Sequence, residues 1–501
     1  MKYHIIYILL CAVAAQAGKA DAPVRPLPKP VVTHHAMKVE GRTLSYTATA
    51  GFLPLEKQDG KRAARIFYVA YTKDDVRNVA DRPITFAFNG GPGASSIWLH
   101  LGALGPKRVD LPGNGTELPE ALRLVDNDQT WLDFTDLVFI DPIGAGYSRA
   151  AKGVDPKQFY ALAKDIDVAA RFIRRYATQY ERWLSPKFIA GESYGTTRAA
   201  ALANRLQNEN GMDLAGVVLL SSALNFETFS CDYGNDIAYA LALPSCSSVA
   251  KYHKKTEADL TNVEKWALSD YLEALARGDT LSPDERDRIA HVVASMTGLS
   301  TAYIEASRLR VSPARFTKEL LRNERRTLGL MDGRVVGVDV TPLGEYPRFD
   351  PSFFLVTGPF VEAANDYLRR DLEFQTEVPY VFLSREVNAA WKWSAHGQGY
   401  ANTADDLAEA MTRNAHFRVF AAAGLYDLTT PYLSQRYTFD HLGLDPSRRG
   451  NLIFKTYPSG HQIYTDPASR KKLHDDVASF VSGTLAQRSA NFSARPAATT
   501  P

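Results

Sequence analysis

The chain is poor in cysteine and carries almost no excess of charge. Three of its 501 residues are cysteines, and the formal net charge is +2. The cysteines are too few to build a tetrahedral zinc site, and no CxxC or HExxH pattern accompanies them. A dedicated nucleic-acid binder needs positive charge to neutralise phosphates, so the charge balance argues against that class. Glycine and proline are ordinary in number, which excludes a collagen-like or low-complexity polymer.

No apolar run is long enough to cross a bilayer, which takes about 20 residues. The run Ile5 to Ala15 is shorter, follows Lys2, and ends in the small-residue segment Ala15-Gln16-Ala17. This arrangement is typical of a secretory signal peptide, predicted over residues 1–17. We therefore expect an exported chain, periplasmic or extracellular, with no stable membrane insertion. A cytosolic protein with an apolar N-terminus is the alternative.

Export would leave two cysteines, Cys231 and Cys246, in an oxidising compartment. They lie fifteen positions apart, and Cys11 would leave with the signal peptide. We predict a Cys231–Cys246 disulfide on this ground. Two buried free thiols are the alternative.

The first half of the chain changes from alternating to continuous apolar patterning. Residues 18–36, rich in Pro, Ala and Lys, are expected to form a flexible leader, and residues 37–71 an antiparallel meander. Beyond them, short apolar runs alternate with the helical patterns at 158–182 and 196–208. The apolar runs occupy 84–88, 137–140, 188–190 and 217–220. Such strands indicate an α/β domain whose mainly parallel sheet is covered on both faces, here spanning 37–224.

This rhythm stops near Asn225. Residues 225–375 hold charged, amphipathic helical stretches and are expected to form a helical insertion, or cap. The stretches lie at 262–277, 283–297 and 313–327. Strand-like runs resume at 417–420 and 452–454, so residues 376–486 are predicted to complete the α/β core. The tail, 487–501, is expected to be disordered.

The run Gly191-Glu192-Ser193-Tyr194-Gly195 matches G-x-S-x-G between an apolar strand and a helix. In that context a serine projects from a tight strand-to-helix turn, with glycines leaving room around it. The following helix directs its N-terminal N–H groups toward developing negative charge. Ser193 is therefore the candidate nucleophile.

A serine hydroxyl is a weak nucleophile and needs a base to take its proton. In this architecture the partners follow in the order serine, acid, histidine. Asp427 follows the predicted strand at 417–420, and His461 follows the one at 452–454. Open α/β sheets place their sites on such loops after strand ends. We predict His461 as general acid and base, with Asp427 orienting it.

The segment Asn89-Gly90-Gly91-Pro92-Gly93 follows the strand-like run at 84–88. Its glycines allow close backbone approach and positive φ. In this geometry one oxyanion donor is the N–H after the nucleophile, and the other comes from such a loop. A phosphate-binding loop is the competing interpretation, but the P-loop lysine and the dinucleotide spacing are both missing.

Together these segments resemble the serine carboxypeptidases. The resemblance rests on blocks that occur in the family's order between Asn89 and His461: Asn89 to Ser96, Leu104-Gly105-Pro106, Asp141 to Ser148, Gly191 to Gly195, the Asp427 loop and Gly460-His461. It implies an α/β-hydrolase fold with a helical insertion and removal of C-terminal amino acids from peptides. It also implies no metal or organic cofactor, and peptides with a free C-terminus as partners.

Site roles follow from the resemblance residue by residue. Gly91 and Tyr194 would supply the oxyanion N–H groups. Asn89, the backbone of Gly90, and Glu192 would hold the substrate's terminal carboxylate. A carboxyl group binds a carboxylate only when one of the two is protonated, so such a site implies a preference for acidic pH.

The chain departs from the family pattern at several positions, and with these departures it resembles the bacterial branch of the family. Ala103 stands where members usually carry a glutamate, and Ala94 where they carry a cysteine. Ala87 replaces a common aromatic residue, and Gln462 a methionine often found after the histidine. Two alternatives follow: another serine hydrolase, such as an esterase, acyltransferase or different exopeptidase, and a catalytically silent binding protein. The oligomeric state stays open.

Overall fold

The structure, a computed structural model, describes residues 27–393 and 399–493, with side chains to residue 488. The predicted signal peptide at 1–17 lies outside the described residues. So do the first part of the predicted leader and the last eight residues of the predicted tail.

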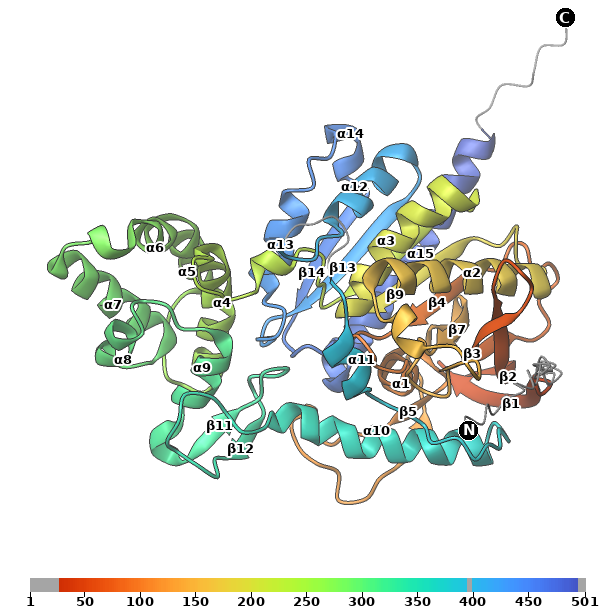
Figure 1. Ribbon diagram of the computed structural model, residues 1–501, viewed down its shortest axis with the longest axis horizontal. Coiled ribbons are helices and arrows are strands. Elements are labelled where there is room, and N and C mark those ends of the chain that lie inside the picture. The colour runs from red at the N-terminus through yellow and green to blue at the C-terminus, as the bar shows by residue number, and fades with distance from the viewer. Residues whose placement is uncertain (1–26, 394–398, 494–501) are drawn as a thin grey trace, which may run out of the picture.

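A ten-stranded sheet forms the centre of the molecule, with strand order β1-β2-β3-β7-β4-β9-β10-β13-β14 and β8 paired to β3 (Figure 1). The pairs β1–β2, β2–β3, β3–β7 and β3–β8 are antiparallel. From β7 to β14 every neighbouring pair is parallel. The strands are β1 (Val31–Val39), β2 (Arg42–Glu56), β3 (Arg62–Lys73), β4 (Ile84–Phe88), β7 (Asp136–Ile140), β8 (Arg149–Ala150), β9 (Lys187–Glu192), β10 (Gly216–Leu220), β13 (Arg418–Gly424) and β14 (Leu452–Tyr457).

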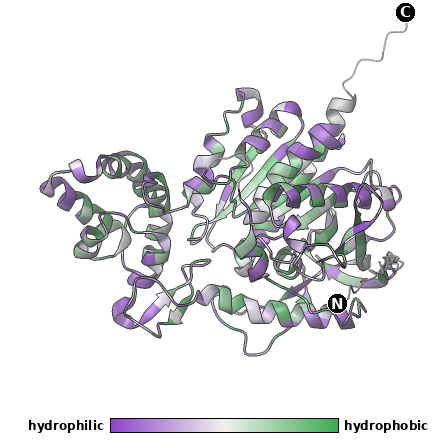
Figure 2. Cartoon of the chain, viewed as in Figure 1, coloured by the Kyte–Doolittle hydropathy of each residue, from purple (hydrophilic) through white to green (hydrophobic). Residues whose placement is uncertain are grey.

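The parallel strands are apolar on both faces because helices cover both. In β10, Val217 and Leu219 pack into one core, and Val218 and Leu220 into the other. One core is closed by α2 (Leu162–Gln179), α3 (Tyr194–Asn210), α12 (Ala404–Arg413) and α13 (Tyr432–Asp440). The other is closed by α1 (Ile97–Leu99), η1 (His100–Leu104), α10 (Pro351–Arg370) and α15 (Pro467–Ser493). Figure 2 shows green strands between helices with purple outer faces.

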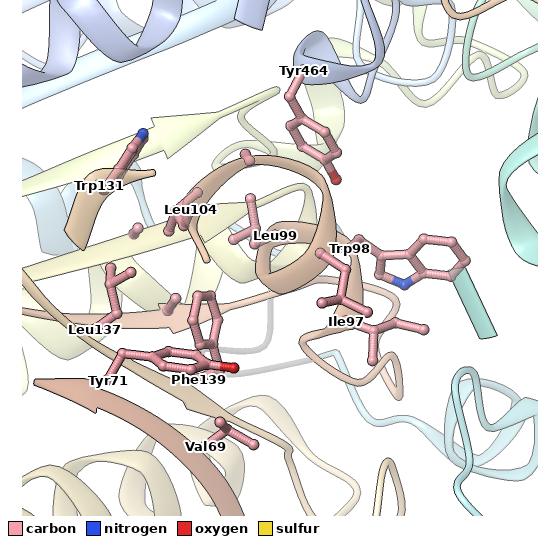
Figure 3. Packing of buried hydrophobic residues seen from close by; sticks show 14 of the residues in the cluster. Val69, Tyr71, Ile97, Trp98, Leu99, Leu104, Trp131, Leu137, Phe139 and Tyr464 are labelled. Atoms are coloured by element: carbon pink, nitrogen blue, oxygen red, sulfur yellow. The ribbon is translucent and has the colours of Figure 1, made fainter. Parts of the chain in front are cut away.

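The packing of the second core is seen from close by in Figure 3, where Leu99 and Leu104 lie over Tyr71, Leu137 and Phe139. The α/β core predicted from the sequence is thus confirmed, with a mixed, mainly parallel sheet covered on both faces.

A helical lobe stands apart from the sheet, at the left of Figure 1. It has its own apolar core, formed by residues such as Val249, Val293 and Phe316. Its elements are α4 (Asp236–Tyr252), α5 (Leu260–Trp266), η5 (Ala267–Tyr271), α6 (Leu272–Arg277), η6 (Gly278–Thr280), α7 (Pro283–Thr297), α8 (Thr301–Ala306), α9 (Pro313–Glu319), η7 (Arg322–Glu324), β11 (Arg326–Leu328) and β12 (Val336–Val338).

The remaining elements are short and lie in the connections. They are β5 (Lys107–Val109), β6 (Leu124–Asp126), η2 (Trp131–Asp133), η3 (Pro156–Phe159), η4 (Phe226–Thr228), α11 (Arg385–Ala390), α14 (Pro446–Arg449) and η8 (Ile463–Thr465). In the described part of the chain, no helix combines the length and the apolar character needed to cross a membrane.

Four segments differ from the sequence-based expectation. Residues 31–36, expected in the flexible leader, belong to β1, because β2 offers a full antiparallel partner from Arg42 to Ala50. Residues 487–493, expected to be disordered, continue α15. Only 313–319 of the helix expected at 313–327 is α-helical, and 326–328 form β11. Within the insertion predicted at 225–375, α10 packs on the α/β core rather than in the lobe.

The predicted Cys231–Cys246 disulfide is wrong, because both cysteines are free thiols. Cys246 lies within α4 and packs in the apolar core of the helical lobe beside Leu243 and Val249. Cys231 lies in the loop before α4, and burial raises the pKa of its thiol to about 12. A thiol that stays protonated reacts slowly with oxidants. Spacing along the chain reveals neither the apolar surroundings nor their effect.

Candidate active site

Ser193 occupies a strained turn between β9 and α3. Its backbone has φ 57° and ψ −129°, a region that non-glycine residues rarely adopt. A Cβ added to Gly191 would lie 2.3 Å from the carbonyl oxygen of Gly195, and one on Gly195 would lie 2.6 Å from that of Phe88. Only glycine fits on either side, so the turn can be this tight. The serine itself is half-buried and therefore accessible.

The predicted acid and base meet at the ends of β13 and β14. His461 Nδ1 lies 2.8 Å from Asp427 Oδ2, and both side chains are buried. The hydroxyl of Ser221 donates to the carbonyl of His461 at 2.6 Å. The N–H of Ser193 donates to the carbonyl of Leu220 at 3.0 Å. Neighbouring residues at the end of β10 thus tie the histidine loop and the serine turn together.

Three further donors hold the carboxylate of Asp427. The N–H groups of Thr429 and Thr430 donate to Oδ1 at 2.8 and 2.9 Å, and the Thr430 hydroxyl donates to Oδ2 at 2.6 Å. Burial by itself lowers the pKa of His461, but the charge and hydrogen bond of Asp427 outweigh it and raise that pKa overall. Glu192 and Asp350 add to the rise. An imidazolium is therefore stabilised at this position, as a general base requires.

The glycine loop after β4 abuts the serine turn. A Cβ on Gly90 would lie 2.7 Å from the nitrogen of Tyr194 and 2.8 Å from Cβ of Ser193. Gly91 has φ +103°, which favours glycine. Among the described residues, the N–H groups of Gly91 and Tyr194 donate to no other group. Both are thus available to an oxyanion formed beside Ser193.

Asn89 and Glu192 form a buried pair next to the serine. Asn89 Nδ2 donates to Glu192 Oε1 at 2.8 Å, and Asn89 Oδ1 accepts from the N–H of Leu99 at 3.0 Å. Burial raises the pKa of Glu192 to about 7, although the nearby charge of His461, the nearby hydroxyl of Tyr464 and the hydrogen bond from Asn89 oppose the rise. Oε2 of Glu192 is buried without a well-formed hydrogen bond. At acidic pH this group is a neutral carboxylic acid, able to donate a hydrogen bond.

Sequence reasoning missed a buried ion pair behind the turn. Arg198 Nε donates to Asp165 Oδ2 at 2.7 Å, and the Tyr194 hydroxyl donates to the same oxygen at 2.9 Å. The guanidinium also lies over the rings of Phe88 and Tyr194. The only sign of this ion pair in the local sequence is that Arg198 directly precedes the alanine-rich run 199–201 of α3. Thr430 was missed as well, although Asp427-Leu428-Thr429-Thr430 is a sequence in which a carboxylate accepts from following N–H groups.

Trp391 and Trp393 lie against the ring of Tyr194. Their ring centroids are 5.3 and 5.6 Å from it, in edge-on contact. Both pack against the core that α2 and α3 close. His396, beyond them, lies outside the described residues. In the described part of the chain, no group of three or more His, Cys, Asp or Glu side chains is arranged to hold a metal ion.

Comparison with known proteins finds carboxypeptidases among the relatives of this chain. Pheromone-processing carboxypeptidase KEX1 of Saccharomyces cerevisiae is 30% identical over 172 residues, 32% of this chain and 22% of that protein. Serine carboxypeptidase-like 20 of Arabidopsis thaliana is 28% identical over 196 residues, 38% of this chain and 35% of the relative. The matched segments thus span well under half the length of these two relatives.

A solved structure shares the fold. The crystal structure of the prohormone-processing carboxypeptidase KEX1(delta)p from Saccharomyces cerevisiae superimposes with a TM-score of 0.54 and 17% identity, covering 87% of this chain and 91% of that one. The fold is therefore the α/β-hydrolase fold. The family model described as serine carboxypeptidase matches residues 39–304, more than half of the sequence. The chain belongs to the serine carboxypeptidase family.

Proposed function

We propose that this protein is a serine-type carboxypeptidase that removes C-terminal amino acids from peptides through an acyl-enzyme on Ser193. Its substrates are peptides with a free C-terminus. The reaction needs a nucleophile, a base, donors for an oxyanion and a group that recognises a terminal carboxylate.

Acylation begins when Ser193 Oγ attacks the carbonyl carbon of the last peptide bond. His461 Nε2 takes the serine proton, and Asp427 stabilises the imidazolium through Nδ1. The N–H groups of Gly91 and Tyr194 hold the oxyanion. As the C–N bond breaks, Nε2 gives its proton to the leaving nitrogen, and the C-terminal amino acid departs. Water then attacks the acyl group with His461 again as base, which releases the shortened peptide and restores Ser193.

The observation that carries the proposal is the buried Asn89–Glu192 pair beside the nucleophile, at 2.8 Å. With a pKa of about 7, Glu192 is protonated at acidic pH and can donate to a carboxylate, whereas its ionised form repels one. Asn89 and the N–H of Gly90 would complete the carboxylate site. An endopeptidase or a simple esterase has no use for a protonated carboxyl group at this position.

Protonation of Glu192 also affects His461, which must be neutral to act as a base. The negative charge of Glu192 is one of the causes that raise the pKa of His461. Protonating Glu192 removes that charge, so the form of the site that accepts a carboxylate is also the form in which His461 is more readily neutral. Since Ala103 offers no second acid, we expect Glu192 to ionise more readily than in relatives that carry a glutamate there.

The test compares an N-benzyloxycarbonyl dipeptide that has a free carboxylate with its C-terminal amide. We expect kcat/KM for the free acid, relative to the amide, to fall about tenfold per pH unit above about pH 7. Glu192→Gln should abolish this dependence. Ser193→Ala should remove nearly all turnover and labelling by a fluorophosphonate. Identical pH profiles for the acid and the amide in the wild type would contradict the proposal and favour an esterase or acyltransferase.

We also propose that the protein is exported and is a bacterial-type member of its family. Export is supported by Lys2, the apolar run Ile5 to Ala15 and the small residues that follow. The departures from the family pattern at Ala87, Ala94 and Ala103 support the assignment to the bacterial branch of the family. Mass spectrometry of the N-terminus of protein recovered from periplasm or medium tests export. Protein found only in the cytosol, with an intact Met1, would contradict it.

A further inference from the structure

Tyr464 carries a buried hydroxyl that lacks a well-formed hydrogen bond. It lies in η8, three residues after His461, and its side chain is 1% exposed. A buried hydroxyl without a partner costs free energy and is uncommon in native proteins. A ligand that accepts a hydrogen bond from this hydroxyl would satisfy it.

The ring of Tyr464 is held by a glycine in the turn of η1. A Cβ on Gly102 would lie 2.3 Å from Cε2 of Tyr464 and 3.2 Å from Cε1 of Phe360 in α10. No residue with a side chain fits at position 102 while the tyrosine stays in place. Figure 3 shows the ring beside the helical turn that carries Leu99, with the hydroxyl pointing toward that turn. Since Asn89 Oδ1 accepts from the N–H of Leu99, the same turn positions Asn89.

The hydroxyl of Tyr464 lies close to Glu192. Tyr464 is one of the groups that lower the pKa of Glu192, and Glu192 is one of the groups that raise the pKa of Tyr464. Yet neither Glu192 Oε2 nor the Tyr464 hydroxyl has a well-formed hydrogen bond. Two buried polar atoms, Glu192 Oε2 and the Tyr464 hydroxyl, therefore lie near each other and are incompletely satisfied, although Gln462 also interacts with the hydroxyl. The adjoining position of the turn, Ala103, adds no polar group.

We propose that the Tyr464 hydroxyl is a further donor to the terminal carboxylate of the substrate, acting beside Asn89 and Glu192. This inference rests on the proposed carboxypeptidase function. Burial, then the charge of Glu192, raises the pKa of the phenol well above its usual value, so it stays a donor at every working pH. Glu192 donates only while protonated. A carboxylate accepts through two oxygens, and thus satisfies both atoms at once.

The test uses Tyr464→Phe, which keeps the ring on Gly102 and removes only the hydroxyl. Tyr457→Phe is the matched control, since it removes a buried hydroxyl that donates to Asp476 at 2.7 Å. We expect Tyr464→Phe to lower kcat/KM for the benzyloxycarbonyl dipeptide acid by about 10- to 100-fold, the worth of a hydrogen bond to a charged group, mainly through KM. Hydrolysis of a p-nitrophenyl ester without a terminal carboxylate should change by less than about threefold.

A second measurement does not depend on peptide turnover. A benzyloxycarbonyl amino acid with a free carboxylate should inhibit ester hydrolysis competitively, and its inhibition constant should rise about 10- to 100-fold in Tyr464→Phe. Equal inhibition constants in wild type and variant would overturn the inference. So would an equal loss of acid and ester hydrolysis, because it would mean that Tyr464 is only structural. If the wild type binds the carboxylate inhibitor but does not cleave the dipeptide, the proposed function fails while the assignment of Tyr464 stands.

Discussion

The guanidinium of Arg198 donates a hydrogen bond to the backbone carbonyl of Asn89 at 3.1 Å. This contact joins the helix after the nucleophile to the loop that carries the candidate carboxylate and oxyanion groups. The same guanidinium pairs with Asp165 Oδ2, and both side chains are buried. The geometry of the Ser193 turn and of the Asn89 loop therefore depends on one buried ion pair behind them.

Removing Arg198 should be costly because it leaves the Asp165 carboxylate buried and unpaired. We expect Arg198→Met to lower the free energy of unfolding by about 3–5 kcal/mol. Urea unfolding followed by tryptophan fluorescence measures the change. The double variant Asp165→Asn/Arg198→Met should regain much of the stability, because asparagine is neutral and still accepts from Tyr194. A double variant no more stable than Arg198→Met would contradict this account.

Thr430→Val should weaken catalysis without weakening substrate binding. The hydroxyl of Thr430 donates to Asp427 Oδ2, the oxygen that also pairs with His461. Without it the carboxylate is less well oriented, and we expect kcat to fall about tenfold with KM little changed, as for a lost hydrogen bond of 1–2 kcal/mol. Thr85→Val, which removes a buried threonine hydroxyl at the start of β4, is the control. A similar fall in kcat in both variants would assign the effect to stability.

Gly90→Ala should disturb the oxyanion donors. The added methyl group would lie 2.7 Å from the nitrogen of Tyr194, so the loop or the serine turn must move. We expect kcat/KM to fall about 100-fold or more for peptides and esters alike, as when one oxyanion donor is lost. Gly358→Ala in α10 is the control, because nothing lies within 4 Å of its added Cβ. An unchanged ester rate in Gly90→Ala would show that the loop does not serve the oxyanion.

Glu192 should make the stability of the protein depend on pH. Its pKa rises from 4.5 in the unfolded chain to about 7 in the folded one, so the folded state binds the proton more tightly. Its contribution is therefore fully present below about pH 4.5 and is lost as pH rises through 7, by about 3 kcal/mol. The free energy of unfolding of Glu192→Gln, measured relative to that of the wild type, should therefore increase by up to that amount between about pH 4.5 and about pH 8.

Urea unfolding of both proteins across this range measures the effect. The charge of His461 lies near Glu192 and contributes to each curve, so the difference between the variants is the informative quantity. A difference that stays constant with pH would mean that Glu192 has the same pKa in both states.

Much of the site follows from local sequence. The turn at Ser193 needs an apolar strand, two glycines and a helix within a short segment, and each has its own residue pattern. The loops of Asp427 and His461 follow strands in the same way, so their meeting at one sheet edge follows from parallel topology. The glycine loop at Gly90 and Gly91 also needs no knowledge of distant residues.

The fold was predictable for the same reason. Continuous apolar strands alternating with helices indicate a covered parallel sheet, and β4, β7, β9 and β10 lie where their runs stand. The edge of the sheet was less predictable. Residues 31–36 are strand only because β2 supplies backbone partners, and β-propensity depends strongly on such context.

The sequence by itself therefore determined the tight turn at Ser193, the positions of Asp427 and His461 after their strands, and the layered core, because each rests on short-range patterns and backbone rules. Tertiary structure alone decided that Cys246 packs as a free thiol, that Arg198 reaches Asp165 and Asn89, and that Tyr464 lies on Gly102. Those contacts join segments far apart in the chain, and their distances are set by how helices and strands pack. No spacing along the sequence encodes a distance of that kind.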